Sequence, residues 1–369
     1  RALTLARLAH VVHAVATHDE RRALADEAEA MARRLDAPVV VASVLGSRVL
    51  ALDGPDDVDD HLEIGAEIIR IGEMTGDPDL VLQGARARIH PLFVVGAHDA
   101  ARDLAHRFGD LAETVRHPDH LRLATMWDVM WAVLEGRFAD AERLADVLRL
   151  RLEVAGHPQA GAIHFMQSFV VQWLRGDLAA TAATVGAQAA QAPDSPTWWA
   201  LRAWVAAATG DAEGAVAHLS VRTPDDLEAV DPGYQWLSAV VGAAAAAAAA
   251  GDPTWADVTY RLLAPYSGRN AVLGYVAYLG AIDHHLGALA TVLGRTEDAV
   301  AHLDAALERH RVIEARPWTA LSAAWLANAL AERDGRGDAE RARRLLAEAV
   351  DTGQVLRLGA LPAIHPKLC

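Results

Sequence analysis

The sequence contains almost no cysteine: Cys369 is the single one among 369 residues. One cysteine excludes an internal disulfide framework and any zinc site built from several thiolates. A chain that relies on no disulfide is typical of a reducing compartment, so we expect a cytoplasmic protein.

Aromatic residues and positive charge are also scarce. Aromatic residues make up 5% of the chain, whereas hydrophobic residues, mostly Ala and Leu, make up 52%. This composition favours helices that pack through small side chains, so we predict an all-α fold. The net charge is −15 and the pI about 5.5. The resulting field repels phosphates, so we expect no direct contact with nucleic acid or with a membrane.

Long hydrophobic runs and a signal sequence are missing too. The most apolar stretch, residues 236–250, is weakly hydrophobic and, at about 15 residues, short for a membrane span. Residues 1–16 are apolar at helical spacing but have no cleavage site and no initiator Met. We therefore expect the chain to be a fragment of a longer protein.

What the sequence does contain is a helix-turn-helix pattern, clearest in residues 281–318. Gly287 and Ala299 lie on either side of a turn at Gly294, among apolar residues at helical spacing. Two antiparallel helices can approach closely at such small residues. A single hairpin of this kind cannot bury its apolar face, so the pattern predicts similar neighbours on both sides.

Turn glycines recur through the chain with a period of about 40 residues, which is two helices per unit. They are Gly54, Gly96, Gly136, Gly176, Gly210, Gly251 and Gly294. Proline and acidic residues at 75–78, 156–158, 194–196 and 223–226 mark the boundaries between hairpins. With further turns at 17–19 and 335–338, the pattern predicts a right-handed α-solenoid of about nine tetratricopeptide-like (TPR-like) hairpins. It spans residues 1–369 as one domain, with a softer junction at 220–232.

Several segments of this array resemble the C-terminal half of the large actinobacterial ATP-binding regulators. They are residues 263–270 (LAPYSGRN), 315–318 (ARPW) and 337–342 (GDAERA). In that family an AAA-like or STAND-type ATP-binding module precedes a TPR-like array. The protein also carries a LuxR-type or winged-helix DNA-binding domain or a nucleotide cyclase domain. The resemblance implies a sensor region whose partners include its own N-terminal ATP-binding and output domains. This chain has no GxxxxGK[ST] phosphate loop and no compact basic helix-turn-helix, so neither activity is assigned to its residues.

The densest acidic cluster is residues 56–60 (DDVDD), which is similar to the aspartate-rich magnesium motif of all-α terpenoid synthases. A magnesium-dependent enzyme would use Asp56, Asp57 and Asp60. The same residues follow the Gly54-Pro55 turn, where carboxylates complement the dipole at a helix N-terminus. We favour the helix N-terminus, because the turn and the dipole already explain the cluster.

Seventeen histidines include three closely spaced pairs. The pairs are His10 with His13, His117 with His120, and His284 with His285. No His-Glu-x-x-His arrangement or nucleophile elbow appears, so we predict no metal site, no cofactor and no catalytic residue. For each pair, a solvated or capping role is favoured over metal binding, and His284 is the one placed on an inward-facing helix.

The register of the repeats predicts a concave groove. In TPR arrays the first helix of each hairpin lines the concave face, so residues ten, six and two before the turn glycine point inward. The candidate wall is Arg86, His90, Met126, Met130, Met166, Ala200, Trp204 and His284. Such a wall could bind a small effector or an extended peptide, although the same residues could be ordinary packing. Most of the ten tryptophans are expected to pack between hairpins, with a few at the groove.

Three functions remain open on these grounds. The first is a non-catalytic sensor and scaffold region of a signalling or transcriptional regulator. The second is an autonomous protein-interaction adaptor, whose acidic charge suits a basic partner. The third, an all-α magnesium enzyme at the acidic cluster, is the least favoured.

Overall fold

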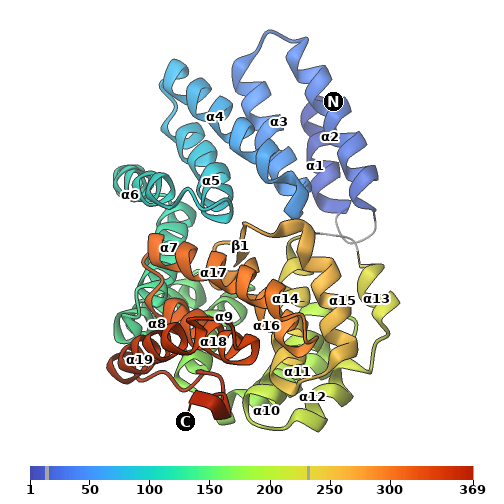
Figure 1. Cartoon of the computed structure of the whole chain (residues 1–369). Coiled ribbons are helices and arrows are strands. Elements are labelled where there is room, and N and C mark those ends of the chain that lie inside the picture. Colours follow the sequence, from blue (N-terminus) through green and yellow to red (C-terminus); the bar gives the residue numbers. More distant parts are fainter. Residues whose placement is uncertain (13–15, 231–232, 369) are drawn as a thin grey trace. The chain divides into compact units, whose positions relative to one another are not determined.

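The computed structural model describes residues 1–12, 16–230 and 233–368. Within them the chain forms nineteen α-helices, a few short 3-10 helices and one two-stranded sheet (Figure 1). The predicted all-α helical-repeat fold is confirmed. In the part of the chain that the structure describes, no helix is both long and apolar enough to cross a membrane.

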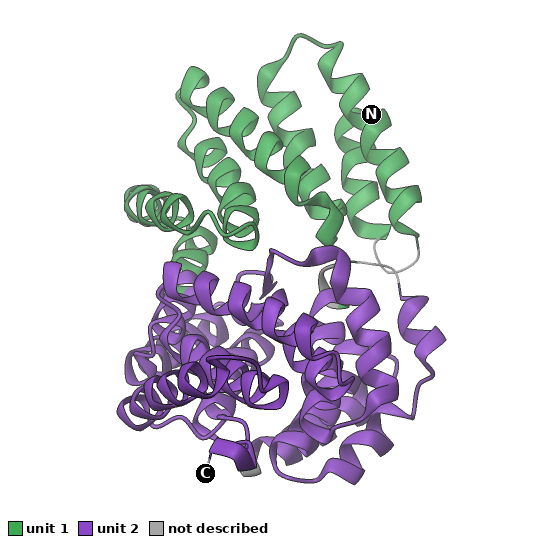
Figure 2. Ribbon diagram, viewed as in Figure 1, with its two compact units in different colours: residues 1–125, 231–236 green, residues 126–230, 237–369 purple. Residues whose placement is uncertain are grey.

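The chain divides into two compact units (Figure 2). Unit 1 comprises residues 1–125 and 231–236, and unit 2 comprises residues 126–230 and 237–369. The chain passes from one unit to the other after residues 125, 230 and 236. The single domain over residues 1–369, with a softer junction at 220–232, stays a prediction, and residues 231 and 232 lie outside the described residues.

The first seven helices begin in unit 1, and the seventh continues into unit 2. They are α1 (Ala2–Val11), α2 (His18–Arg33), α3 (Pro38–Ala51), α4 (Val58–Thr75), α5 (Pro78–Val94), α6 (His98–Val115) and α7 (Pro118–Leu134), with the 3-10 helix η2 (Pro55–Asp57) before α4.

Unit 2 continues with α8 (Phe138–Val154), α9 (Ala160–Arg175), α10 (Ala179–Gln191), α11 (Pro196–Ala208), α12 (Ala212–Leu219) and α13 (Pro224–Glu228). After α14 (Tyr234–Ala250), α15 (Pro253–Leu263) and η3 (Ala264–Tyr266) come the strands β1 (Asn270–Leu273) and β2 (Ala277–Ala281). The last elements are α16 (Ile282–Val292), α17 (Thr296–Val312), α18 (Arg316–Arg333), α19 (Asp338–Leu356) and η4 (Pro366–Leu368).

Six of the seven predicted turn glycines end a helix in the left-handed backbone conformation. Gly96, Gly136, Gly176, Gly210, Gly251 and Gly294 have φ between 67° and 88°. This conformation costs glycine little because it has no Cβ, and it satisfies carbonyls at the helix end. Gly54 differs from the prediction: its backbone is extended, with φ of −78° and ψ of 166°, and it precedes η2.

Three of the four predicted helix starts are confirmed by their capping bonds, whereas α9, after residues 156–158, begins at Ala160 without a side-chain cap. The side chains of Asp77 and Ser195 accept hydrogen bonds from backbone N–H groups in the first turns of α5 and α11. Thr223 forms a capping box with Asp226 at the start of α13. Each of these three helices has proline in its first turn, where the missing N–H costs no helical hydrogen bond.

Polar contacts between neighbouring hairpins join residues that are about one repeat apart. Arg175 pairs with Glu142, 33 residues away, and Tyr260 contacts His302, 42 residues away. The pairs Arg33 with Glu67, Arg295 with Asp257 and Arg311 with Glu348 are separated by 34, 38 and 37 residues. Equivalent positions of successive hairpins therefore lie side by side, as a stacked repeat requires.

In unit 1, the backbones of α4 and α5 touch at two glycines. A Cβ on Gly84 would lie 2.6 Å from the carbonyl oxygen of Gly65, and a Cβ on Gly65 would lie 2.8 Å from that of Gly84. Any side chain at either position would push the helices apart. Beside the crossing, Leu45, Ile68 and Ile71 are buried in the apolar core of this unit.

In unit 2, the close approach predicted at Gly287 is confirmed. A Cβ on Gly287 of α16 would lie 2.4 Å from Cγ of Leu303 on α17. At the end of the chain, Gly359 N–H donates to Leu174 O over 2.9 Å. A Cβ on Gly176 would meet Gly359 at 2.9 Å. The segment after α19 therefore lies against the C-terminal end of α9, so the last hairpin of unit 2 returns to one of its first.

We expect Gly287→Leu to lower the free energy of unfolding of unit 2 by about 2 kcal/mol, because the added branches overpack the contact with Leu303. Chemical denaturation of the two proteins measures this. Gly161→Leu is a matched control, since a Cβ at Gly161 of α9 meets nothing within 4 Å. Equal losses in both variants would show that helix contact at Gly287 is not the cause.

The sheet is the part of the fold that the all-α prediction missed. β1 and β2 pair antiparallel, with Val272 opposite Tyr278 and Leu273 opposite Ala277, and all their residues are buried. A continuous buried run has no alternation, so its periodicity does not distinguish a strand from a buried helix. The available signal is glycine: Gly268, Gly274 and Gly280 all have positive φ, which a helix does not accommodate.

Candidate functional site

The eight predicted groove residues are divided between the two units. Arg86 and His90, one turn apart on α5, are half-buried in unit 1. In unit 2, Met126, Met130, Ala200, Trp204 and His284 are buried, and Met166 is half-buried. That these residues line a ligand groove stays a prediction. Five of the six in unit 2 lie in a packed interior.

Aromatic rings from α9, α11 and α18 meet in this interior. The ring centroid of Trp173 lies 5.0 Å from that of Trp204 and 5.2 Å from that of Trp318. Phe169 contacts Trp204 edge-on at 5.3 Å. Such tilted and edge-on pairs suit the ring quadrupoles and bury large apolar areas. The contact between Trp173 and Trp318 joins α9 to α18, which are more than a hundred residues apart in the sequence.

The β1–β2 hairpin lies against these rings. Tyr278 of β2 contacts Trp318 edge-on at 5.7 Å, and Tyr275 at the hairpin tip contacts Trp127 of α7 at 5.9 Å. Gly280 allows the approach, because a Cβ there would lie 2.5 Å from the ring of Trp318. The inward faces of the helices in unit 2 are thus covered, at Trp127 and Trp318, by a segment of the same chain.

A chain of hydrogen bonds runs beside Trp318 and fixes the tautomers of two histidines. The Ala281 N–H can only donate, so His310 Nε2 accepts this bond at 3.0 Å. His310 therefore carries its proton on Nδ1 and donates to Ser322 Oγ at 3.0 Å. The Ser322 hydroxyl then donates to His284 Nδ1 at 2.8 Å. Separately, His285 Nε2–H donates to Leu279 O at 2.7 Å.

Burial keeps these three histidines neutral. Desolvation lowers the pKa of His285 to about 4, and desolvation with the nearby His285 and Arg309 lowers the pKa of His310 to about 3. The pKa of His284 is lowered well below its usual value, by burial first and then by His285 and His310. The arrangement can accept and relay hydrogen bonds, and it resists positive charge.

We expect the stability of unit 2 to fall as the pH is lowered from about 6.5 towards 4.5. In this range the unfolded chain binds protons on His285 and His310 that the folded chain does not bind, so acid favours unfolding. At pH 5 each of the two should lower the free energy of unfolding by about 2 kcal/mol relative to pH 7.5. Urea denaturation at both pH values measures the loss.

The control for this prediction is His285→Gln, whose amide N–H can still donate to Leu279 O but does not titrate. Its free energy of unfolding should fall less between pH 7.5 and pH 5 than that of the parent. Carboxylates with lowered pKa, such as Asp283 and Asp79, contribute their loss at lower pH, below their ordinary values near 4. An identical pH dependence in His285→Gln and in the parent would contradict the assignment.

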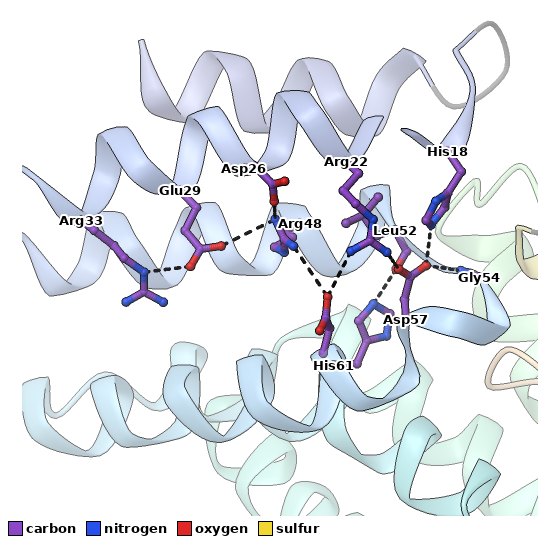
Figure 3. Close-up of polar contacts among 11 residues, drawn as sticks. His18, Arg22, Asp26, Glu29, Arg33, Arg48, Leu52, Gly54, Asp57 and His61 are labelled. Carbon is purple, nitrogen blue, oxygen red and sulfur yellow. Dashed lines mark hydrogen bonds and ion pairs between the residues drawn. The ribbon is translucent and has the colours of Figure 1, made fainter. Parts of the chain in front are cut away.

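In unit 1, the acidic cluster takes part in a network of ion pairs (Figure 3). Asp57 is fully buried at the end of η2. It accepts hydrogen bonds from His18 Nε2 at 2.8 Å, from Gly54 N–H at 3.0 Å and from the guanidinium of Arg22. Asp60 of α4 pairs with Arg22 at 3.3 Å. The carboxylates therefore connect η2 and α4 to α2.

The network continues along one face of α2. Arg48 of α3 pairs with Asp26, and lies 3.7 Å from both Glu29 and Asp60, while Arg33 pairs with Glu29 at 2.8 Å (Figure 3). Arginines thus pair with Asp57 and Asp60, two of the three carboxylates that a magnesium ion would use. In the described ranges, no group of three or more His, Cys, Asp or Glu side chains is placed to hold a metal ion. The geometry supports a structural role for the cluster, as a junction of three helices.

The other histidine pairs have ordinary contacts where they are described. His120 Nε2 hydrogen-bonds Asp79 Oδ1 at 2.7 Å, and its ring lies 5.2 Å from that of His117. His10 Nδ1 contacts Leu50 O at 3.0 Å. His13 lies outside the described residues.

Comparison of the sequence with protein-family models and with curated proteins finds no match. The site must therefore be understood from its own residues. Sequence reasoning identified His284 and Trp204 but missed His310, Ser322, Tyr275 and Tyr278. The signal for His310 and Ser322 was present: Ser322 lies 38 residues after His284, about one repeat, and 12 residues after His310 across a turn.

Proposed function

We propose that this chain is the non-catalytic sensor and scaffold region of a signalling or transcriptional regulator. It recognises a small effector or a protein partner on the inward faces of its helical hairpins. It passes that event to an ATP-binding switch and an output domain in the same polypeptide. This is the function that the family-like segments at 263–270, 315–318 and 337–342 favour.

The interior of unit 2 is the observation that carries the proposal. There, helices from several hairpins hold an extended segment, the β1–β2 hairpin, through Trp127, Trp318 and hydrogen bonds between its backbone and two histidines. Aromatic rings with a few directed polar groups are also what binds peptides and small ligands in clefts. Since each hairpin contacts mainly its neighbours, binding across several of them favours one curvature of the array over another.

Two measurements test the proposal. The first is the reading frame upstream of the codon for Arg1: a long frame that encodes a phosphate-binding loop supports it, and a frame that starts close to Arg1 favours an autonomous adaptor. The second is hydrogen exchange of residues 126–369 within the complete polypeptide, with ATP and with ADP. Different protection in the two nucleotide states is expected, and identical protection would contradict coupling between the array and the switch.

We further expect this chain alone neither to hydrolyse ATP nor to bind duplex DNA at physiological salt. It has no phosphate loop, and its net charge of −15 repels the DNA backbone. Phosphate release and fluorescence anisotropy with labelled DNA measure the two activities. Micromolar DNA affinity that weakens steeply with added salt is the result that would refute this expectation.

A further inference from the structure

The β1–β2 hairpin is held in unit 2 by side chains of α16 and α17. His310 accepts the N–H of Ala281, and His285 donates to the carbonyl of Leu279. Before β1, the Ser267 hydroxyl and the Gly268 N–H each donate to the carboxylate of Asp283 at 2.7 Å. Each end of the hairpin is therefore attached by hydrogen bonds to ionisable side chains.

The bond between Ala281 and His310 requires a neutral imidazole. Protonation would place an N–H on Nε2, directed at the N–H of Ala281, so two donors would face each other. It would also remove the first acceptor in the series of hydrogen bonds that runs from Ala281 through His310 and Ser322 to His284. His284 Nδ1 has the same limitation, because it accepts from Ser322. A proton on His310 breaks a bond that holds β2 in place, and a proton on His284 breaks the bond from Ser322 behind it.

The surroundings give such a proton little compensation. His285 and His284 of α16 and Arg309 of α17 are basic, and Tyr278 of β2 lies edge-on to His310 at 6.1 Å. From α18 the contacts are Ser322 and Trp318. The carboxylate of Asp283 favours a proton on His310, but it is already hydrogen-bonded to Ser267, Gly268 and His302 Nδ1, the last at 2.8 Å. Protonated histidines here would repel one another and the neighbouring arginine.

We propose that the β1–β2 hairpin is a proton-sensitive latch, which acidification releases from the interior of unit 2 while the helices around it stay folded. Release uncovers Trp127 and Trp318 on the inward faces of α7 and α18. The latch consists of contacts inside unit 2. It does not depend on which partner the array recognises, and it therefore goes beyond the proposed function.

The hairpin is a suitable element for local opening. A two-stranded sheet has little stability of its own, and this one carries an irregularity between Asn270 and Val272. Its tip, residues 274–276, is half-buried, so opening can begin there. The hairpin depends on its contacts with α16, α17 and Trp318, and its release need not separate the helical hairpins from one another.

Hydrogen exchange of the full chain at pH 7.5 and pH 5.0 tests the latch. In the opened hairpin each histidine regains an ordinary affinity for protons, so at pH 5 each favours opening by about 30-fold. The protection factors of residues 270–281 should fall by at least this factor and should remain below those of α19 (338–356) at both pH values, because α19 opens only with the whole unit. If residues 270–281 and α19 have equal protection factors at both pH values, the hairpin opens only with the whole unit and the proposal is wrong.

Two variants identify the proton acceptor. In His310→Gln the amide oxygen can accept from Ala281 and the amide nitrogen can donate to Ser322, but the side chain does not titrate. The loss of protection of residues 270–281 between pH 7.5 and pH 5.0 should therefore be about 30-fold smaller than in the parent. His106→Gln is the control, because His106 is exposed on α6 of unit 1. If residues 270–281 lose as much protection at pH 5.0 in His310→Gln as in the parent, the proposal is wrong. If that variant does not fold, His285→Gln tests the same point, because it removes a second titrating anchor of the hairpin.

Discussion

Replacing Trp204 with alanine is expected to lower the free energy of unfolding of unit 2 by about 4 kcal/mol. The side chain is 4% exposed, and its ring packs against Phe169 and Trp173. On α14, a Cβ at Gly242 would lie 3.7 Å from the same ring, so the backbone of that helix is close as well. Truncation leaves a cavity between these helices. Because their other contacts hold the helices in place, the cavity does not close, and its cost adds to the free energy lost with the buried side chain.

The matched control is Trp198→Ala on the same helix. Trp198 is half-buried and contacts Phe165 at 5.3 Å, so its loss should cost clearly less. Urea denaturation of both variants gives the comparison. If Trp204 instead formed an open groove wall, its replacement would change the denaturation midpoint little, and equal small losses in the two variants would show that the interior of unit 2 is not packed around it.

The repeat architecture was predictable from the sequence because its signals are local. Positive φ at a helix end is a property of the glycine itself, and the capping residues act within one turn of it. Six turn glycines and the caps at Asp77, Ser195 and Thr223 could therefore be found without knowing any tertiary contact. Gly54 was the exception, because a turn glycine can also precede a 3-10 helix in extended conformation.

The candidate site was predictable only in part, because it depends on contacts between distant segments. Met130, Trp204 and His284 were predicted to point inward and are buried, but their register says nothing about what covers them. The covering segment is a β-hairpin whose apolar strands have no distinguishing period. The acidic cluster shows the same limit: its helix-terminal position was visible in the sequence, whereas Arg22 and Arg48, which neutralise it, come from α2 and α3.

In unit 1, Gly84→Leu is expected to lower the free energy of unfolding by about 3 kcal/mol, which is the upper part of the range for overpacked cores. At Gly84 the nearest atoms to an added Cβ are the Gly65 carbonyl oxygen at 2.6 Å and the Ile69 backbone nitrogen at 2.7 Å. Backbone atoms cannot rotate away as the side chain of Leu303 can at Gly287. The whole of α5 must therefore move from α4, which separates the apolar contacts on both sides of the crossing.

Gly109→Leu on α6 separates this effect from helix propensity. A Cβ at Gly109 meets nothing within 4 Å, so leucine there should stabilise the helix by about 0.5 to 1 kcal/mol relative to glycine. The same substitution thus changes the free energy of unfolding in opposite directions at two helical glycines of one unit. Because the two units need not unfold together, hydrogen exchange in peptides from α4 and α5 should accompany the denaturation curves. A stabilising or neutral Gly84→Leu would mean that α4 and α5 do not cross backbone to backbone, and the tight hairpin at the centre of unit 1 would be wrong.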